Sequence, residues 1–122
     1  MGKEIWVLDD DVNVHHMIEN MVIDIKSNDI ILLKSFNSAQ SVLDEIKIKT
    51  PYVLLVDLYM PQINGIDFLQ TLSEMSGYSK PNIYIISNSI NPNDIKDAWK
   101  TDLITDYIPK PIMLNDLEEI LA

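Results

Sequence analysis

Five polar side chains in this 122-residue sequence directly follow short apolar runs. They are three carboxylates, one hydroxyl and one ammonium group: Asp9, Asp10, Asp57, Ser87 and Lys110. Carboxylates held close together repel one another, which raises at least one pKa unless a cation is present. Mg²⁺ removes that repulsion, because it binds hard oxygen ligands while keeping water and phosphate oxygens. A carboxylate can also attack phosphorus and form an aspartyl phosphate, and an ammonium group and a hydroxyl would stabilise the phosphoryl group in transfer.

The most informative of these residues is Asp57. Four apolar residues, 53–56, lead into it, and the turn residues Pro61 and Asn64-Gly65 follow. Such a run between turn signals is typical of a strand that is buried on both faces. Asp57 therefore stands where a rigid element leaves the core, a position that suits a reactive group better than a packing group.

The rest of the chain predicts alternating strands and helices. Apolar runs predict buried strands, and apolar residues spaced by three and four predict helices that pack on one side. The expected strands are 5–8, 30–33, 52–56, 82–86 and 106–108. The expected helix stripes are Val14, Ile18, Met21, Val22 and Ile25; Ala39, Val42, Leu43 and Ile46; Ile66, Leu69 and Leu72; Ile95, Ala98 and Trp99; and Leu117, Ile120 and Leu121.

Helix starts are marked by capping residues. Asp11, Ser38 and Asn91 are natural N-caps, Asn64-Gly65 opens another helix, and Pro92 suits a first helical position. A strand followed by a helix five times implies a parallel sheet with helices on both faces. Because ligands bind beyond the carboxyl ends of such strands, the five polar residues should meet at one edge.

Composition excludes several classes of protein. Asp and Glu number 19 against 9 Lys and Arg, a net charge of −10, which argues against binding nucleic acid or anionic lipid. The sequence has no cysteine, which excludes disulfides, thiolate chemistry and cysteine-ligated zinc. No apolar run reaches the roughly 20 residues of a membrane span, and the N-terminus is unlike a signal peptide. We expect one cytoplasmic domain spanning residues 1–122.

Four motifs together resemble the receiver domain of bacterial two-component response regulators, over the whole chain. They are Val7-Leu8-Asp9-Asp10-Asp11, Val56-Asp57-Leu58-Tyr59-Met60-Pro61 with Asn64-Gly65, Ile85-Ile86-Ser87-Asn88, and Tyr107-Ile108-Pro109-Lys110-Pro111. The resemblance implies an α/β fold of the flavodoxin-like, CheY-like (βα)5 type, a three-layer sandwich whose parallel sheet has the strand order 2-1-3-4-5.

The resemblance also implies a role for each site residue. Asp57 is the phosphoacceptor, Asp10 binds Mg²⁺ directly, and Asp9 acts on the metal mainly through water. The backbone carbonyl of Tyr59 completes the metal site. Ser87 donates a hydrogen bond to the phosphoryl group and Lys110 pairs with it. The rotamer of Tyr107 follows the state of Ser87, and the Lys110–Pro111 peptide bond is expected to be cis.

The implied function is a signalling switch. A histidine kinase or a histidine phosphotransfer protein donates the phosphoryl group to Asp57 with Mg²⁺, and affinity for a downstream protein partner, which the sequence does not identify, then changes. The chain would catalyse only its own phosphorylation and dephosphorylation. We expect a monomer or weak dimer, and the turn after Ser87 and the end at Ala122 resemble stand-alone receivers.

Several positions depart from the family pattern. Ser87 replaces the commoner Thr, and Asn88 is larger than the usual Ala or Gly and would narrow access for the phosphodonor. Met113 stands where a Thr often begins the last helix, so that cap is expected to be missing. Tyr59 is expected to shield the acyl phosphate from water and lengthen its lifetime.

Two alternatives remain open. Asp9-x-Asp11 after an apolar strand also resembles the nucleophile motif of haloacid-dehalogenase-type phosphatases, with Asp9 as nucleophile and Asp11 as acid and base. The other alternative is a receiver-like scaffold that takes no phosphate. His15 and His16 are interpreted as solvated or partly packed, since adjacent helix residues do not share a face.

Overall fold

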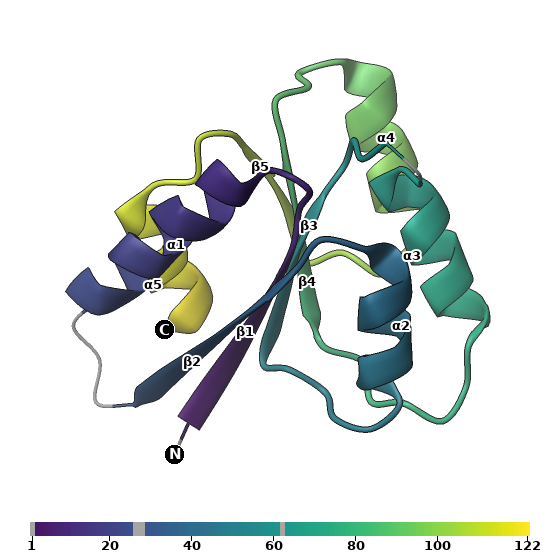
Figure 1. Ribbon diagram of the computed structural model, residues 1–122. Helices are drawn as coiled ribbons and strands as arrows, with labels where there is room; N and C mark the ends of the chain where they lie inside the picture. The colour runs from purple at the N-terminus through teal and green to yellow at the C-terminus, as the bar shows by residue number, and fades with distance from the viewer. Residues whose placement is uncertain (1, 26–28, 62) are drawn as a thin grey trace.

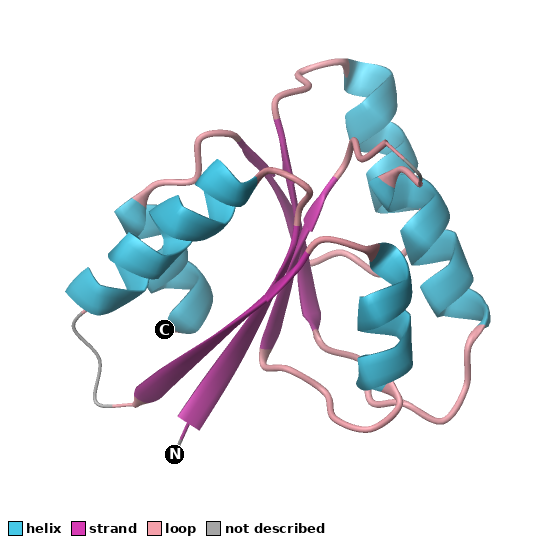
Figure 2. Cartoon of the chain, viewed as in Figure 1, coloured by secondary structure: helices cyan, strands magenta, loops and turns pink. Residues whose placement is uncertain are grey.

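The computed structural model describes residues 2–25, 29–61 and 63–122, in which five strands alternate with five helices (Figures 1 and 2). The strands are β1 (Gly2–Leu8), β2 (Ile30–Phe36), β3 (Val53–Asp57), β4 (Asn82–Ser87) and β5 (Asp106–Pro109). The helices are α1 (Val12–Asp24), α2 (Ala39–Ile46), α3 (Gly65–Glu74), α4 (Pro92–Lys100) and α5 (Leu114–Leu121). Each element lies where the sequence predicted it, although most strands extend by one or more residues.

The strands form one parallel sheet in the order β2-β1-β3-β4-β5, which confirms the expected fold. Helices α1 and α5 cover one face, and α2, α3 and α4 cover the other (Figure 1). Successive β1 residues point to opposite faces: Ile5 and Val7 pack under α1 and α5, whereas Trp6 and Leu8 pack on the other side. β3 is buried along its whole length, so Asp57 ends a rigid central strand.

Side chains cap four of the five helices. The side chains of Asp11, Ser38, Asn64 and Asn91 each accept a hydrogen bond from a backbone N–H in the first turn, as predicted. At the start of α5, Met113 offers no side-chain cap. Its own N–H instead donates to Asp116 Oδ2 at 2.8 Å, so this end of α5 keeps one capping contact that the sequence analysis did not anticipate.

The expectation that residues 30–33 form a buried strand was wrong. β2 is an edge strand, and its apolar side chains Ile30 and Leu32 are 67% and 49% exposed. Helix α2, the nearest helix on that face, has only eight residues and is about 12 Å long, whereas β2 is about 23 Å long. Only the far end of β2 is well covered, where Phe36 is buried.

The packing of helix α4 also differs from the expectation. Its inward residue is Ala98, which is fully buried, while Ile95 is half-buried and Trp99 is 44% exposed. The expected packing of Trp99 between helix and sheet is therefore only partial. Within the described ranges, no helix combines the length and the apolar character needed to cross a membrane.

Candidate functional site

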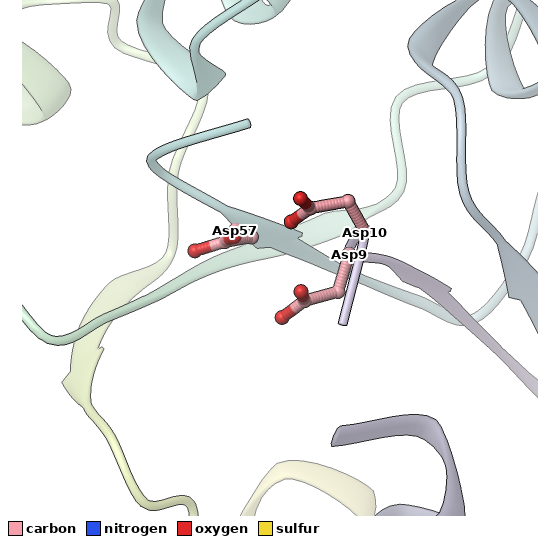
Figure 3. A group of neighbouring side chains, drawn as sticks. All are labelled: Asp9, Asp10 and Asp57. Carbon is pink, nitrogen blue, oxygen red and sulfur yellow. The ribbon is translucent and has the colours of Figure 1, made fainter. Parts of the chain in front are cut away.

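The carboxyl ends of β1 and β3 bring three carboxylates together. One oxygen each from Asp9, Asp10 and Asp57 lies within 4.8 Å of the others, and Figure 3 shows the three side chains around the ends of these strands. Asp9 is fully buried, Asp57 is 6% exposed, and Asp10 is open to solvent. The predicted acidic cluster is thus present.

Lys110 is the cation of this cluster. Its Nζ lies 2.9 Å from Asp9 Oδ2 and 3.3 Å from Asp57 Oδ1, so one ammonium group bridges both buried carboxylates. Burial alone would lower the pKa of Lys110, but the hydrogen bond and charge of Asp9, together with Asp57, raise that pKa above its usual value. The Lys110–Pro111 peptide bond is cis, as expected.

The charge of the cluster is only partly balanced. Burial and then the negative charge of Asp9 raise the pKa of Asp57, Lys110 opposes both effects, and the net result is a pKa of about 6. Three carboxylates face one ammonium group, and all of the anionic donors are hard oxygens. This donor set fits a divalent cation such as Mg²⁺, which would offset the remaining negative charge.

Both oxygens of Asp9 are already occupied. Oδ2 contacts Lys110, and Oδ1 accepts the N–H of Asp11 at 2.9 Å. Among the residues that the structure describes, none holds the Asp10 side chain in this way, and Asp10 lines a hollow of about 360 Å³ together with Asn37, Ser38 and Pro61. This difference agrees with the expected division of labour, in which Asp10 rather than Asp9 binds the metal directly, and that division stays a prediction.

His15 supports the end of β1, a role that the sequence analysis missed. Its ring is buried, and its Nε2 lies 2.7 Å from the backbone oxygen of Asp9. Because a carbonyl oxygen can only accept, this nitrogen must carry the proton. Nδ1 is buried and has no partner among the residues that the structure describes. The only available signal was position, since His15 lies near the inward residues Val14 and Ile18; His16 is exposed.

Ser87 lies beside the acidic cluster at the end of β4. It follows Ile86, which pairs with Asp57 across the sheet, and its backbone oxygen accepts the Lys110 N–H at 2.7 Å. The Ser87 side chain is fully buried, and its Oγ accepts the N–H of Ser89 at 3.0 Å. Tyr107 is half-buried, and its hydroxyl donates to the backbone oxygen of Ser89 at 3.2 Å. Ser87 and Tyr107 therefore contact the same residue.

Tyr59 contacts α4 through its hydroxyl. Its side chain is 55% exposed, and its hydroxyl donates to Asp94 Oδ2 in the first turn of that helix. A backbone hydrogen bond from Tyr59 lowers the pKa of Asp57, although burial and Asp9 outweigh it. The contact with Asp94 could not be predicted from the sequence. The role of the Tyr59 carbonyl as a metal ligand stays a prediction.

Gly65 keeps the loop after Asp57 compact. Its N–H donates to the backbone oxygen of Leu58 at 2.6 Å. A Cβ atom at this position would lie 2.8 Å from the Asp57 oxygen and 3.0 Å from the Leu58 Cα, which is too close for backbone atoms that cannot move independently. The glycine is therefore required by close approach of α3 to the end of β3.

Comparison with known proteins gives a consistent result. The model of the response regulator receiver domain family matches residues 5–122. The DNA-binding transcriptional regulator NtrC of Proteus hauseri is 28% identical over 97% of this chain and 23% of its own length. The sensory/regulatory protein RpfC of Xanthomonas campestris pv. campestris is 30% identical over 70% of this chain and 12% of its length. The chain thus spans less than a quarter of either curated relative.

Solved structures share the fold. The phosphorylated cyanobacterial phytochrome response regulator RcpA superposes with a TM-score of 0.80 and 19% identity, covering 99% of this chain and 89% of its own. The chemotaxis protein CheY4 of Vibrio cholerae gives a TM-score of 0.82 at 16% identity, covering 99% and 97%. At these identities the likeness concerns the fold alone.

Proposed function

The chain belongs to the response regulator receiver domain family, the phosphoacceptor switches of two-component systems, and we propose that Asp57 is the residue that accepts the phosphoryl group. The observation that carries this proposal is the position of Asp57. It ends a fully buried strand, contacts Lys110, and lies within reach of two further carboxylates. Asp9 also contacts Lys110, but both of its oxygens are already held, and Asp10 is open to solvent.

Phosphoryl transfer then follows from ordinary carboxylate chemistry. An oxygen of Asp57 forms a bond to phosphorus as the phosphorus–nitrogen bond of a phosphohistidine breaks, and the imidazole leaves. Lys110 lies where its charge can offset that of the phosphoryl oxygens, and Ser87 can donate its hydroxyl proton to one of them. Bound Mg²⁺, held by Asp10, Asp57 and, through water, Asp9, would neutralise charge on the transferring group.

The signal would leave the site through Ser89. Phosphorylation adds about −1.5 to −2 charge next to Lys110 and Ser87. When Ser87 turns its hydroxyl toward that group, the bond from the Ser89 N–H must adjust, and the Tyr107 hydroxyl contacts the carbonyl of the same residue. The surface of α4 and β5, which includes the exposed Trp99, would then change its affinity for a protein partner.

Partners are proposed at the level of their class. Receiver domains exchange phosphoryl groups with histidine kinases or histidine phosphotransfer proteins, and a donor of that class is proposed here. The hollow beside Asp10 leaves room for its imidazole. We propose a downstream protein rather than nucleic acid as the target of this domain, since its net charge is −10. It would act in the cytoplasm as a monomer or weak dimer, and not as a turnover enzyme.

A labelling experiment tests the assignment. The protein is incubated with acetyl phosphate in Mg²⁺ or in chelator, and the added phosphoryl group is measured by intact mass. We expect one group in Mg²⁺, none in chelator, and none in Asp57→Asn, while Asp97→Asn, an exposed carboxylate on α4, labels normally. Label on Asp9 with turnover of phosphate esters would instead support a phosphatase. An unlabelled wild-type protein would support a scaffold.

A further inference from the structure

Two loops leave the sheet on the side of α4, and their side chains meet. One loop follows β3 and carries Tyr59, two residues after Asp57; the other follows β4 and carries Ser89, two residues after Ser87. β3 and β4 are hydrogen-bonded neighbours, so these loops leave the same edge next to each other. Figure 1 shows both loops running from the strand ends toward α3 and α4.

Asp94 joins the two loops through one carboxylate oxygen. Asp94 Oδ2 accepts the Tyr59 hydroxyl and also accepts the Ser89 Oγ at 2.6 Å. Both bonds favour the ionised carboxylate: Ser89 and then Tyr59 lower the pKa of Asp94, and the bond to Asp94 raises the pKa of Tyr59. Charge-assisted hydrogen bonds of this kind are stronger than neutral ones.

Ser89 links Asp94 to the phosphoryl-transfer site, because it bonds to both Asp94 and Ser87. The Ser89 Oγ donates to Asp94 and accepts the Asn91 N–H at 3.2 Å. The Ser89 N–H donates to Ser87 Oγ at 3.0 Å, and the Ser89 carbonyl accepts the Tyr107 hydroxyl. On the other loop, Tyr59 follows Asp57 by two residues, and its backbone lowers the pKa of Asp57. Each loop is thus tied at one end to a residue of the phosphoryl-transfer site and at the other to Asp94.

We propose that Asp94 is a positioning residue that clamps the Tyr59 loop to the Ser89 loop and thereby limits how fast Asp57 gains and loses its phosphoryl group. The proposal rests on Asp57 being the phosphoacceptor. Gain requires a donor, and loss requires a water molecule, to approach the phosphorus from outside the protein. Loops that are clamped together restrict that approach, and loops that are free to separate permit it.

Tyr59→Phe is the sharpest test, because it removes only the hydroxyl that bonds to Asp94 and leaves the ring and the backbone unchanged. Protein labelled with acetyl phosphate is freed of donor, and the remaining label is followed by intact mass. We expect label to be lost about 2 to 10 times faster than in wild type, the factor that corresponds to one hydrogen bond. The initial rate of labelling should rise in the same direction.

The partner variant closes a double-mutant cycle. Asp94→Ala removes the acceptor of both hydroxyls and should accelerate the loss of label. The double variant Tyr59→Phe/Asp94→Ala should be no faster than Asp94→Ala alone, because the bond that Tyr59→Phe removes is already absent. Asp97→Ala, which makes the same change at an exposed position of the same helix, should leave the lifetime unchanged. A purely structural role of Asp94 would lower the unfolding midpoint without this coupling between lifetimes.

The outcomes separate the two proposals. If wild-type protein takes no label, or if Asp57→Asn still does, the assignment of the phosphoacceptor fails. If wild-type protein labels on Asp57 but Tyr59→Phe loses label at the wild-type rate or more slowly, the clamp is wrong and the phosphoacceptor stands. Additive effects of Tyr59→Phe and Asp94→Ala would also overturn the clamp.

Discussion

The carboxyl edge of the sheet buries polar side chains, whereas the first half of β2, residues 30–33, exposes apolar ones. We call residues 30–33 the free half of β2. At the carboxyl edge, Asp9, Asp57 and Ser87 are buried, although such groups prefer water. Along β2, Ile30 and Leu32 are exposed, although such side chains prefer the core. The two regions therefore depart from the usual distribution of residues in opposite directions.

The two departures differ in what supports them. Each of these three buried residues has specific contacts: Asp9 has Lys110 and the Asp11 N–H, Asp57 has Lys110, and Ser87 has the Ser89 N–H. The exposed apolar side chains of β2 only reflect a short α2. Because unpaired buried charge is costly and scattered exposed apolar groups are not, the supported buried charges are the better guide to function.

At the carboxyl edge, the largest expected effect comes from removing the shared cation. Lys110→Met leaves Asp9 and Asp57 buried without their partner, so we expect the free energy of unfolding at pH 7 in chelator to fall by about 2–4 kcal/mol. Urea denaturation measures this change. Lys96→Met, which alters an exposed lysine of α4, should change it by less than about 0.5 kcal/mol. Equal effects of the two variants would show that the carboxyl edge is not electrostatically special.

A smaller effect is expected from crowding the loop behind Asp57. Gly65→Ala places a methyl group 2.8 Å from the Asp57 backbone oxygen, so we expect a loss of about 1–3 kcal/mol in the free energy of unfolding. Phosphorylation should also slow, because the end of β3 must shift. Gly2→Ala is the matched control, since its added methyl group would make only ordinary contacts. Thermal unfolding of both variants with the labelling rate provides the comparison.

Asp57→Asn should stabilise the protein while abolishing labelling. The pKa of Asp57 is raised from 3.8 to about 6 on folding, so the unfolded chain releases this proton first and stability falls as pH rises from about 4 to about 6. In chelator we expect the variant to gain about 1–2 kcal/mol above pH 6 and almost nothing at pH 4. Urea titrations across this range measure the difference. A constant difference from pH 4 to pH 7 would contradict the raised pKa.

The smallest change in the free energy of unfolding is expected for a substitution in β2. Leu32→Thr keeps a side chain suited to a strand and removes apolar surface that is already half exposed, so the free energy of unfolding should change by less than about 0.5 kcal/mol. Leu54→Ala, in the fully buried β3, should cost about 2–5 kcal/mol. A large loss in Leu32→Thr would mean that the free half of β2 is covered in solution.

The position of the site could be predicted because the ends of the strands can be identified from the sequence. Apolar runs ending at Leu8, Val56 and Ile86 were each followed by polar residues, and a parallel sheet must gather those ends at one edge. The helix caps were equally readable, since capping depends on a few adjacent residues. The residue roles came from family resemblance and stay predictions, while the structure shows that Lys110 and the three carboxylates lie close together.

The errors and omissions concern contacts between segments distant in the chain. Residues 30–33 are as apolar as 83–86, and only the edge position of β2 and the short α2 distinguish them. The bond between Tyr59 and Asp94 joins residues 35 positions apart, and Tyr59 lies in an irregular loop where no periodicity constrains side-chain direction. The burial of His15 likewise depends on how α1 docks against the end of β1.

Because only one of the two tryptophans is exposed, fluorescence quenching can report on helix α4, which carries the exposed one. Trp6 is sealed in the core and donates its indole N–H to Glu4 at 2.6 Å, whereas Trp99 stands half in solvent on the helix that carries Asp94. Iodide added to the folded protein should therefore quench the fluorescence of Trp99 and spare that of Trp6. A change in quenching on phosphorylation, absent in Trp99→Phe, would register the movement of α4 without any attached dye.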